Sequence, residues 1–120
     1  MSKFSKDTDV IDSREIIERI EELRGALDGA PTPEIYAELQ ALAALDNAGR
    51  DASEDWQHGV TLINDDYFVE YARELAEDIG AVRPGASWPL SYIDWEDAAQ
   101  ELQHDYCAVE FDGRLFWVAP

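Results

Sequence analysis

The alternation of apolar and acidic positions is most regular between Asp65 and Asp105, where it predicts two helices. In the segment Asp65–Ile79, apolar side chains recur at three- and four-residue steps, which is typical of one buried helix face. The segment from Asp94 to about Asp105 repeats this pattern after a connection broken by Pro and Gly. Acidic residues recur at every fourth position on another face of each segment. We therefore expect two helices, each with one apolar and one acidic stripe.

The acidic stripes are the candidate binding site. Only Arg73 opposes the first stripe, and no base interrupts the second. Like charges four residues apart destabilise an isolated helix by about 0.2–0.5 kcal/mol per pair, so these rows are a local cost that folding does not require. The residues that would carry a function are Asp66, Glu70, Glu74, Glu77, Asp78, Glu96, Asp97, Glu101 and Asp105.

Short β-strand patterns flank the two helices. The β-branched run Val60–Ile63 predicts a strand before the first helix. Asp112-Gly113 separates the runs Cys107–Phe111 and Arg114–Val118, and it predicts a hairpin because a type I′ turn needs positive φ at both central residues. This two-residue loop places Val109 opposite Phe116. Residues 51–120 are thus predicted to form an α+β domain in which the two acidic helices cover one face of a small antiparallel sheet.

The first half of the chain predicts a polar tail, residues 1–10, and a helical hairpin. Asp12 or Ser13 can cap a helix that ends at Asp28-Gly29, and Thr32-Pro33 starts a second helix. The hairpin has one leucine-rich seam, so it must pack on the rest of the chain or on a second copy, as in a homodimer. The seam residues of the first helix are Ile16, Ile20, Leu23 and Leu27.

The segment Asn47–Asp55 is rich in Gly, Ala, Ser and Asp, and it is the best candidate for a boundary. It divides the chain into residues 1–50, the tail and hairpin, and residues 51–120, the acidic domain. One unit that contains both parts is the alternative.

The composition is that of a folded but strongly acidic protein. With 120 residues, 46% of them apolar, and 13 aromatic side chains, the chain can bury a core despite its net charge of -18. Residues 1–50 hold 11 acids and 6 bases, whereas residues 51–120 hold 16 acids and 3 bases. This balance argues against nucleic acid or an anionic membrane as a direct partner, and it favours a basic protein surface or cations.

The size of the charge can be compared with that of DNA. Duplex DNA carries one charge per about 1.7 Å of axis, so 18 charges match roughly 30 Å of duplex. A compact chain of this length has an expected radius of gyration of about 13–14 Å, hence a diameter of roughly 35 Å. On these numbers the protein would be about as charged as DNA of its own length.

Motifs for catalysis, metals and cofactors are absent from the sequence. There is no phosphate-binding glycine loop, no zinc or calcium pattern and no nucleophile elbow, and His58 and His104 have no partner at ligand spacing. Cys107 is the only cysteine, expected on the buried side of its strand, so no intrachain disulfide can form. No apolar run is long enough to span a bilayer. We expect a non-enzymatic, cofactor-free cytoplasmic protein.

The C-terminal part of the chain resembles the C-terminal part of the ArdA antirestriction proteins. The residues that carry this resemblance are Tyr67–Asp78, Tyr92–Leu102, Tyr106 and the strands through Phe116. The similar elements are an acidic helix of the form Tyr/Phe-Ala-Arg-Glu, a loop, an Ile-Asp-Tyr/Trp-Glu helix and a closing hairpin. The resemblance covers residues 67–118, and the helical hairpin Ser13–Leu45 has no counterpart in it. Members of that family are DNA mimics from phages and mobile elements. They form elongated dimers and inhibit type I restriction-modification enzymes, and the resemblance implies the same kind of action here.

Two hypotheses of different classes follow. The first is a DNA-mimic inhibitor that blocks the DNA-binding groove of a defence enzyme, either a restriction-modification enzyme or a CRISPR effector, since any positively charged DNA channel accepts such a mimic. The second is a small acidic adaptor that binds a partner through the leucine-rich seam, its acidity serving solubility. A solvated surface or adaptation to a salty environment would also explain acidic rows. The uneven distribution of bases favours mimicry over this reading.

Overall fold

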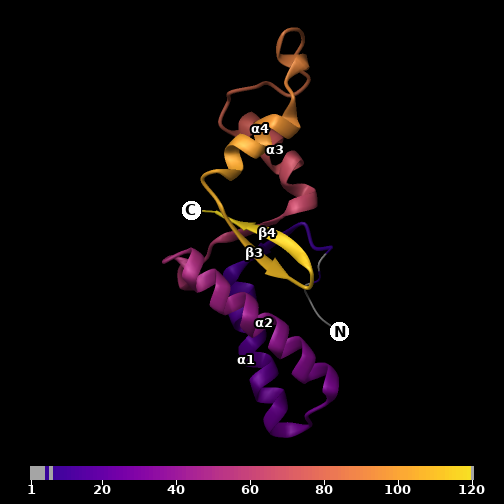
Figure 1. Cartoon of the computed structure of the whole chain (residues 1–120), viewed down its shortest axis with the longest axis vertical. Coiled ribbons are helices and arrows are strands. Elements are labelled where there is room, and N and C mark those ends of the chain that lie inside the picture. Colours follow the sequence, from indigo (N-terminus) through magenta and orange to yellow (C-terminus); the bar gives the residue numbers. More distant parts are fainter. Residues whose placement is uncertain (1–4, 6, 120) are drawn as a thin grey trace.

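A four-stranded antiparallel sheet lies at the middle of the molecule and two pairs of helices extend from it in opposite directions (Figure 1). This arrangement is seen in a computed structural model that describes residue 5 and residues 7–119. The molecule measures 60 × 27 × 20 Å, and its radius of gyration is 17.0 Å. The predicted α+β class is confirmed. The expected radius of about 13–14 Å is wrong, because that value assumes helices stacked compactly on the sheet.

The strands follow the order β1-β2-β4-β3, with β1 at Val10–Asp12, β2 at Thr61–Asn64, β3 at Cys107–Phe111 and β4 at Arg114–Val118. The predicted hairpin register is confirmed, since Val109 pairs with Phe116. Its turn residues Asp112 and Gly113 have φ values of 53° and 80°. A type I′ turn therefore connects β3 to β4, as the Asp-Gly pair predicted.

Strand β1 lies where a polar tail was expected to end. Its three residues pair antiparallel with β2, and Ile11, opposite Leu62, is 1% exposed. Three residues are too few for a period-two pattern to be recognised, so only the long-range pairing with β2 reveals this strand. The other residues of the expected tail lie partly outside the described residues.

Helices α1, Ser13–Gly29, and α2, Pro33–Ala52, form the predicted hairpin. The side chain of Asp12 accepts a hydrogen bond from the amide of Arg14, and Thr32 accepts one from Ile35, so both predicted N-caps are in place. The hairpin packs against one face of the sheet. The resulting core consists mainly of Ile11, Ile16, Ile20, Leu23, Leu42, Leu45, Trp56, Leu62, Val109, Phe111, Phe116 and Val118.

The expected boundary Asn47–Asp55 is helical through Ala52. Gly49 faces the ring of Trp56 from η1, Trp56–His58, so closely that an added Cβ would lie 2.3 Å from it. The Trp56 side chain is 1% exposed, and its Nε1 donates to Asp46 at 2.7 Å. Packing of this ring on α2 outweighs the low helix propensity of the segment, so the helix continues into the expected boundary.

The two acidic helices were expected to cover a face of the sheet, and instead they meet only part of it. α3 spans Phe68–Asp78, after the single turn η2, Asp65–Tyr67, and α4 spans Trp95–Gln103. Their shared core contains Ile63 and Trp117 of the sheet together with Phe68, Ala72, Ala99, Leu102 and Tyr106. On the same face, Ala108, Glu110 and Leu115 are exposed. The pair α3–α4 therefore projects beyond the sheet, which produces the elongated shape.

Cys107 was expected to be buried, and it is exposed. The alternation of the strand was read correctly, because Val109 and Phe111 are buried on the side that faces α1 and α2. Cys107 is the first residue of an edge strand, where this cover ends.

Candidate functional site

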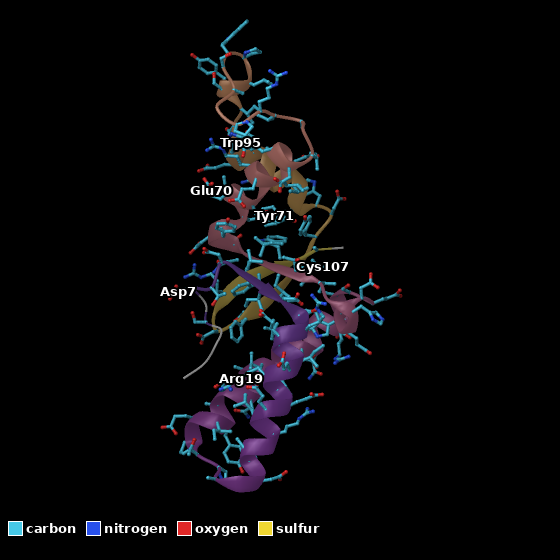
Figure 2. All side chains as sticks on the ribbon, turned by 180° about the vertical axis from the view of Figure 1, so that it is seen from behind. Asp7, Arg19, Glu70, Tyr71, Trp95 and Cys107 are labelled. Carbon is cyan, nitrogen blue, oxygen red and sulfur yellow. The ribbon has the colours of Figure 1, made fainter. Side chains whose placement is uncertain are left out.

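The nine predicted residues form what we call the acidic surface: Asp66, Glu70, Glu74, Glu77, Asp78, Glu96, Asp97, Glu101 and Asp105. Eight of them are exposed, and Glu77 is half-buried. Figure 2 shows Glu70 on the outer side of α3, whereas Tyr71 of the same helix points inward. Seven of the carboxylates are thus carried by α3 and α4, mostly on the faces turned away from the core, as the four-residue spacing predicted, whereas Asp66 lies in η2 and Asp105 follows α4.

An aromatic cluster holds α3 in place beneath its acidic stripe. Phe68 is fully buried, with ring centroids 5.3 Å from Tyr106 and 5.9 Å from Trp117. The hydroxyls of Tyr71 and Tyr106 lie 3.0 Å apart and join α3 to the residue before β3. Burial, together with the hydrogen bond to Tyr71, raises the pKa of Tyr106.

Local hydrogen bonds order the first turns of both helices. The hydroxyl of Tyr67 donates to both carboxylate oxygens of Glu74, at 2.9 and 3.0 Å, and this bond raises the pKa of Tyr67. Asp94 caps α4 by accepting from the amide of Asp97 at 3.1 Å. These contacts fix side-chain and backbone positions without neutralising the carboxylates.

The placement of acids along the helices is only partly favourable. Glu96 and Asp97 stand in the first turn of α4, where the positive end of the helix dipole stabilises a negative charge. At the opposite ends, neither α3 nor α4 has a base in its last turn, and α3 ends with Glu77 and Asp78. Acids at a helix C-terminus oppose the dipole, so folding alone gives no reason for them.

Few bases neutralise the acidic surface. Arg114 pairs with Asp66, Arg73 lies 3.7 Å from Glu77, and His104 lies 4.0 Å from Glu101. In the part of the chain that the structure describes, the remaining members other than Glu74 have no ion-pair or hydrogen-bond partner on their side chains: Glu70, Asp78, Glu96, Asp97 and Asp105. Most of the negative charge is therefore available to an outside partner.

The charge density of this surface can be set against that of DNA. The molecule is 60 Å long, and a duplex of that length carries about 35 charges, so the net charge of -18 reaches only about half of its density. The expectation of equal density for the whole chain is therefore wrong, because the chain is longer than assumed. Within one helix, acids four residues apart recur about every 6 Å, which is a little more than half the charge density of a single DNA strand, at 3.4 Å per charge.

Asp65 extends the acidic surface and was not among the predicted residues. Its carboxylate accepts a hydrogen bond from Trp117 Nε1 at 3.0 Å, and the residue is exposed. Together with Glu96 it lines a shallow groove of about 250 Å³ between the start of α3 and α4. Asp65 does not belong to the acidic stripe that recurs every four residues from Asp66. Only the contact between the helices shows that Asp65 lies on the acidic surface.

The alternative site, the leucine-rich seam, is mostly inaccessible. Ile16, Ile20 and Leu23 are 0%, 5% and 3% exposed, because they form the core between α1, α2 and the sheet. Only Leu27 of the predicted seam is half-buried; it lines a groove of about 320 Å³ together with Tyr36. The hypothesis that the whole seam binds a partner is therefore wrong for the folded chain.

No helix among the described residues is long and apolar enough to cross a membrane. Within the same residues, no group of three or more His, Cys, Asp or Glu side chains could hold a metal ion. Comparisons of the chain with protein-family models, with curated proteins and with solved structures found no match. The resemblance of residues 67–118 to the ArdA proteins therefore remains an expectation from the sequence.

Proposed function

We propose that this protein is a non-enzymatic inhibitor that occupies the DNA-binding groove of a bacterial defence enzyme, with the acidic surface in the place of DNA phosphates. The observation that carries the proposal is the set of exposed carboxylates on α3 and α4 that no base among the described residues neutralises. The two helices share a core around the buried ring of Phe68, so the charges are held in place before binding. A preorganised surface loses less conformational entropy when it binds.

Two further features support this reading over a merely soluble surface. Acids at the C-terminal end of α3 and acidic neighbours four residues apart both lower helix stability, yet among the described residues only Arg73, 3.7 Å from Glu77, offsets them in α3. In the first half, by contrast, acids are mixed with bases, and Glu22, Glu38 and Asp46 take part in ion pairs. A chain adapted only to salt or solubility has no reason for this difference.

The target is an enzyme with a basic DNA-binding groove, and type I restriction-modification enzymes and RNA-guided CRISPR effectors are the two classes to examine. The test is a competition assay in which each purified enzyme binds a fluorescent DNA duplex and the protein displaces it. We expect displacement to weaken steeply between about 50 and 200 mM salt, as binding of DNA to such grooves does. Displacement that is absent for both enzymes, or that is insensitive to salt, would contradict the proposal.

A matched pair of variants shows which carboxylates act. The test variant carries Glu70→Gln, Glu74→Gln and Glu101→Gln, and we expect weaker displacement with a smaller salt slope, as when phosphate contacts are removed. The control carries Glu18→Gln, Glu21→Gln and Glu34→Gln, three exposed residues of α1 and α2. The net charge changes equally in both. Equal effects of the two variants would mean that only total charge matters and would exclude a specific mimic.

The seam hypothesis needs a different variant from the one the sequence suggests. Ile20→Asp would place a charge in the core and unfold the protein, so its loss of binding would not identify an interface. Tyr36→Asp on the surface of α2 is suitable, because Tyr36 is 55% exposed and lines the remaining groove. We expect it to leave displacement of DNA unchanged.

A further inference from the structure

The connection between α3 and α4, residues 79–93, differs chemically from the rest of the molecule. We call it the apolar tip. It contains no acidic residue and one base, Arg83, in a chain whose net charge is -18. It forms the end of the molecule farthest from the α1–α2 hairpin, as the orange loop in Figure 1 shows. An apolar end with a net charge of +1 therefore adjoins the most acidic part of the structure.

The apolar tip concentrates exposed hydrophobic side chains. Of seven large hydrophobic residues that are exposed in the described part of the chain, four lie within it. They are Ile79, Trp88, Leu90 and Tyr92, with exposures of 70%, 75%, 45% and 79%. Single exposed hydrophobic residues are common on protein surfaces, but a group of them rimmed by polar residues is typical of an interaction site.

Backbone hydrogen bonds give the apolar tip a defined conformation. Gly80, with φ of 80°, ends α3 in a Schellman motif in which its amide donates to Glu77 and the amide of Ala81 donates to Ala76. Farther along, the amide of Ser91 donates to Ser87 and that of Tyr92 donates to Pro89. The aromatic side chains thus stand on an ordered backbone, so their fixation on binding costs little further entropy.

The two bases of the segment 65–105, Arg73 and Arg83, both line a cavity of about 260 Å³ at the base of the apolar tip. Glu77 and Trp95 line the same cavity. The same segment holds 11 acids. Its few positive charges are thus gathered beside the tip, so the rest of the acidic surface keeps its charge.

We infer that the apolar tip is the aromatic anchor of the inhibitory interface: Trp88 and Tyr92 enter an apolar pocket beside the basic groove along which the acidic surface lies. The inference rests on the proposed function. Trp and Tyr are the residues most often found as energetic centres of interfaces. The carboxylates supply attraction that depends on salt, and the anchor supplies affinity that does not.

Charge complementarity selects this partner over other occupants. In a dimer formed tip to tip, two acidic segments of net charge -9 would approach each other and repel. An anionic membrane would repel them in the same way. A basic protein with an apolar pocket satisfies both the tip and its acidic surroundings.

The test measures affinity and salt slope separately in the competition assay with the type I restriction-modification enzyme and the RNA-guided effector. The variant is Trp88→Ala with Tyr92→Ala, and the control is Tyr36→Ala, an exposed aromatic residue at the opposite end. We expect the tip variant to bind about 30-fold more weakly or worse with an unchanged salt slope. The control should bind like the wild type. Circular dichroism should show an unchanged melting temperature for both, because these side chains are exposed.

Each outcome decides between the two ideas. Salt-dependent binding that the tip variant retains at full strength would overturn the anchor and leave the mimic intact. Absence of salt-dependent binding by the wild type to both enzymes would overturn the proposed function and the anchor together. A tip variant that changes from dimer to monomer in sedimentation, with equal affinity per monomer, would assign the tip to a second copy and overturn the inference.

Discussion

The α1–α2 hairpin and the α3–α4 pair both extend from the central sheet, but they use their acids in different ways. In the hairpin, Arg19 binds Glu38 through two hydrogen bonds of 2.7 and 3.1 Å, and both side chains are largely buried. Asp46 accepts from Arg50 at 2.9 Å and from Trp56. In the α3–α4 pair, five carboxylates of the acidic surface have no such partner among the described residues.

The apolar residues show the reverse arrangement. The hairpin buries its stripe in the core, and its connecting turn exposes no large hydrophobic residue, whereas the α3–α4 connection exposes four. The hairpin therefore pairs Glu22, Glu38 and Asp46 with bases and buries its apolar stripe, although Glu18, Glu21 and Glu34 stay exposed to solvent. The α3–α4 pair leaves most of its acids unpaired and exposes a group of hydrophobic residues in its connection. The difference indicates that the first pair is built for stability and the second for contact with a partner.

The largest expected effect comes from separating α3 from the sheet. Phe68→Ala removes the fully buried ring that links α3 to Trp117 and Tyr106, and we expect the free energy of unfolding to fall by about 3–5 kcal/mol. Urea unfolding followed by circular dichroism measures it. A loss below about 1 kcal/mol would mean that the aromatic cluster does not hold the acidic helices in place.

Gly49→Ala tests how closely the hairpin packs. Helix propensity alone predicts a gain of about 1 kcal/mol, but the added methyl group would meet the buried ring of Trp56. We expect a loss of about 1–3 kcal/mol, because a fully buried ring held at its Nε1 cannot move away without strain.

The matched control for this change is Gly25→Ala in α1, since no atom lies within 4 Å of an added Cβ there. Its thermal stability should rise slightly. A gain at both positions would show that Trp56 moves freely and that the junction is loosely packed.

One type of substitution should have opposite effects in the two regions. Glu38→Gln removes the charge that holds Arg19, and we expect it to cost about 1 kcal/mol. Glu70→Gln with Glu74→Gln removes a like-charge pair and should raise stability by about 0.2–0.5 kcal/mol. Chemical denaturation of both variants measures the difference. If both variants changed stability in the same direction, paired acids and unpaired acids could no longer be distinguished by their contribution to stability.

The smallest expected effect is that of salt on the wild type. Because the net charge of -18 repels itself in the folded state, moderate sodium chloride should stabilise the protein by about 0.5 kcal/mol, or a rise in melting temperature of about 2–4 °C. Mild acidification toward the isoelectric point of about 4.1 should act in the same direction. A melting temperature that stays constant from low to moderate salt would contradict the prediction.

Further acidification should reverse this gain. Hydrogen bonds from Arg14 lower the pKa of Asp12 below its usual value of 3.8, so the folded state favours the ionised carboxylate. This contribution to stability is complete above pH 3.8 and is lost as the pH falls through the lowered pKa. A scan of melting temperature against pH should therefore show a maximum. Asp12→Asn should weaken the decline on its acidic side.

Much of the candidate site was predictable from local sequence rules. The spacing of Glu70, Glu74 and Asp78 places them on one helix face, because 3.6 residues per turn leave no other choice once the apolar face is buried. Asp112-Gly113 determined the hairpin register, since few turns suit that pair. Thr32-Pro33 likewise specified where α2 begins. Each of these rules involves residues within one or two turns of each other.

Only the tertiary structure decided the features that depend on distant contacts. Strand β1 forms because Ile11 pairs with Leu62 of β2, and α2 continues through Gly49 because Trp56 packs against it. The seam of Ile16, Ile20 and Leu23 had the pattern of a surface for a partner, yet the sheet of the same chain covers it. The spacing of apolar and charged residues shows which face of a helix is buried, but it does not show which part of the protein covers that face. The hydrophobic effect is non-directional, so any apolar surface can provide the cover. The sequence pattern was sufficient to predict two acidic helices. The length of the molecule, 60 Å, depends on how little of the sheet these helices contact, and this follows only from the tertiary structure.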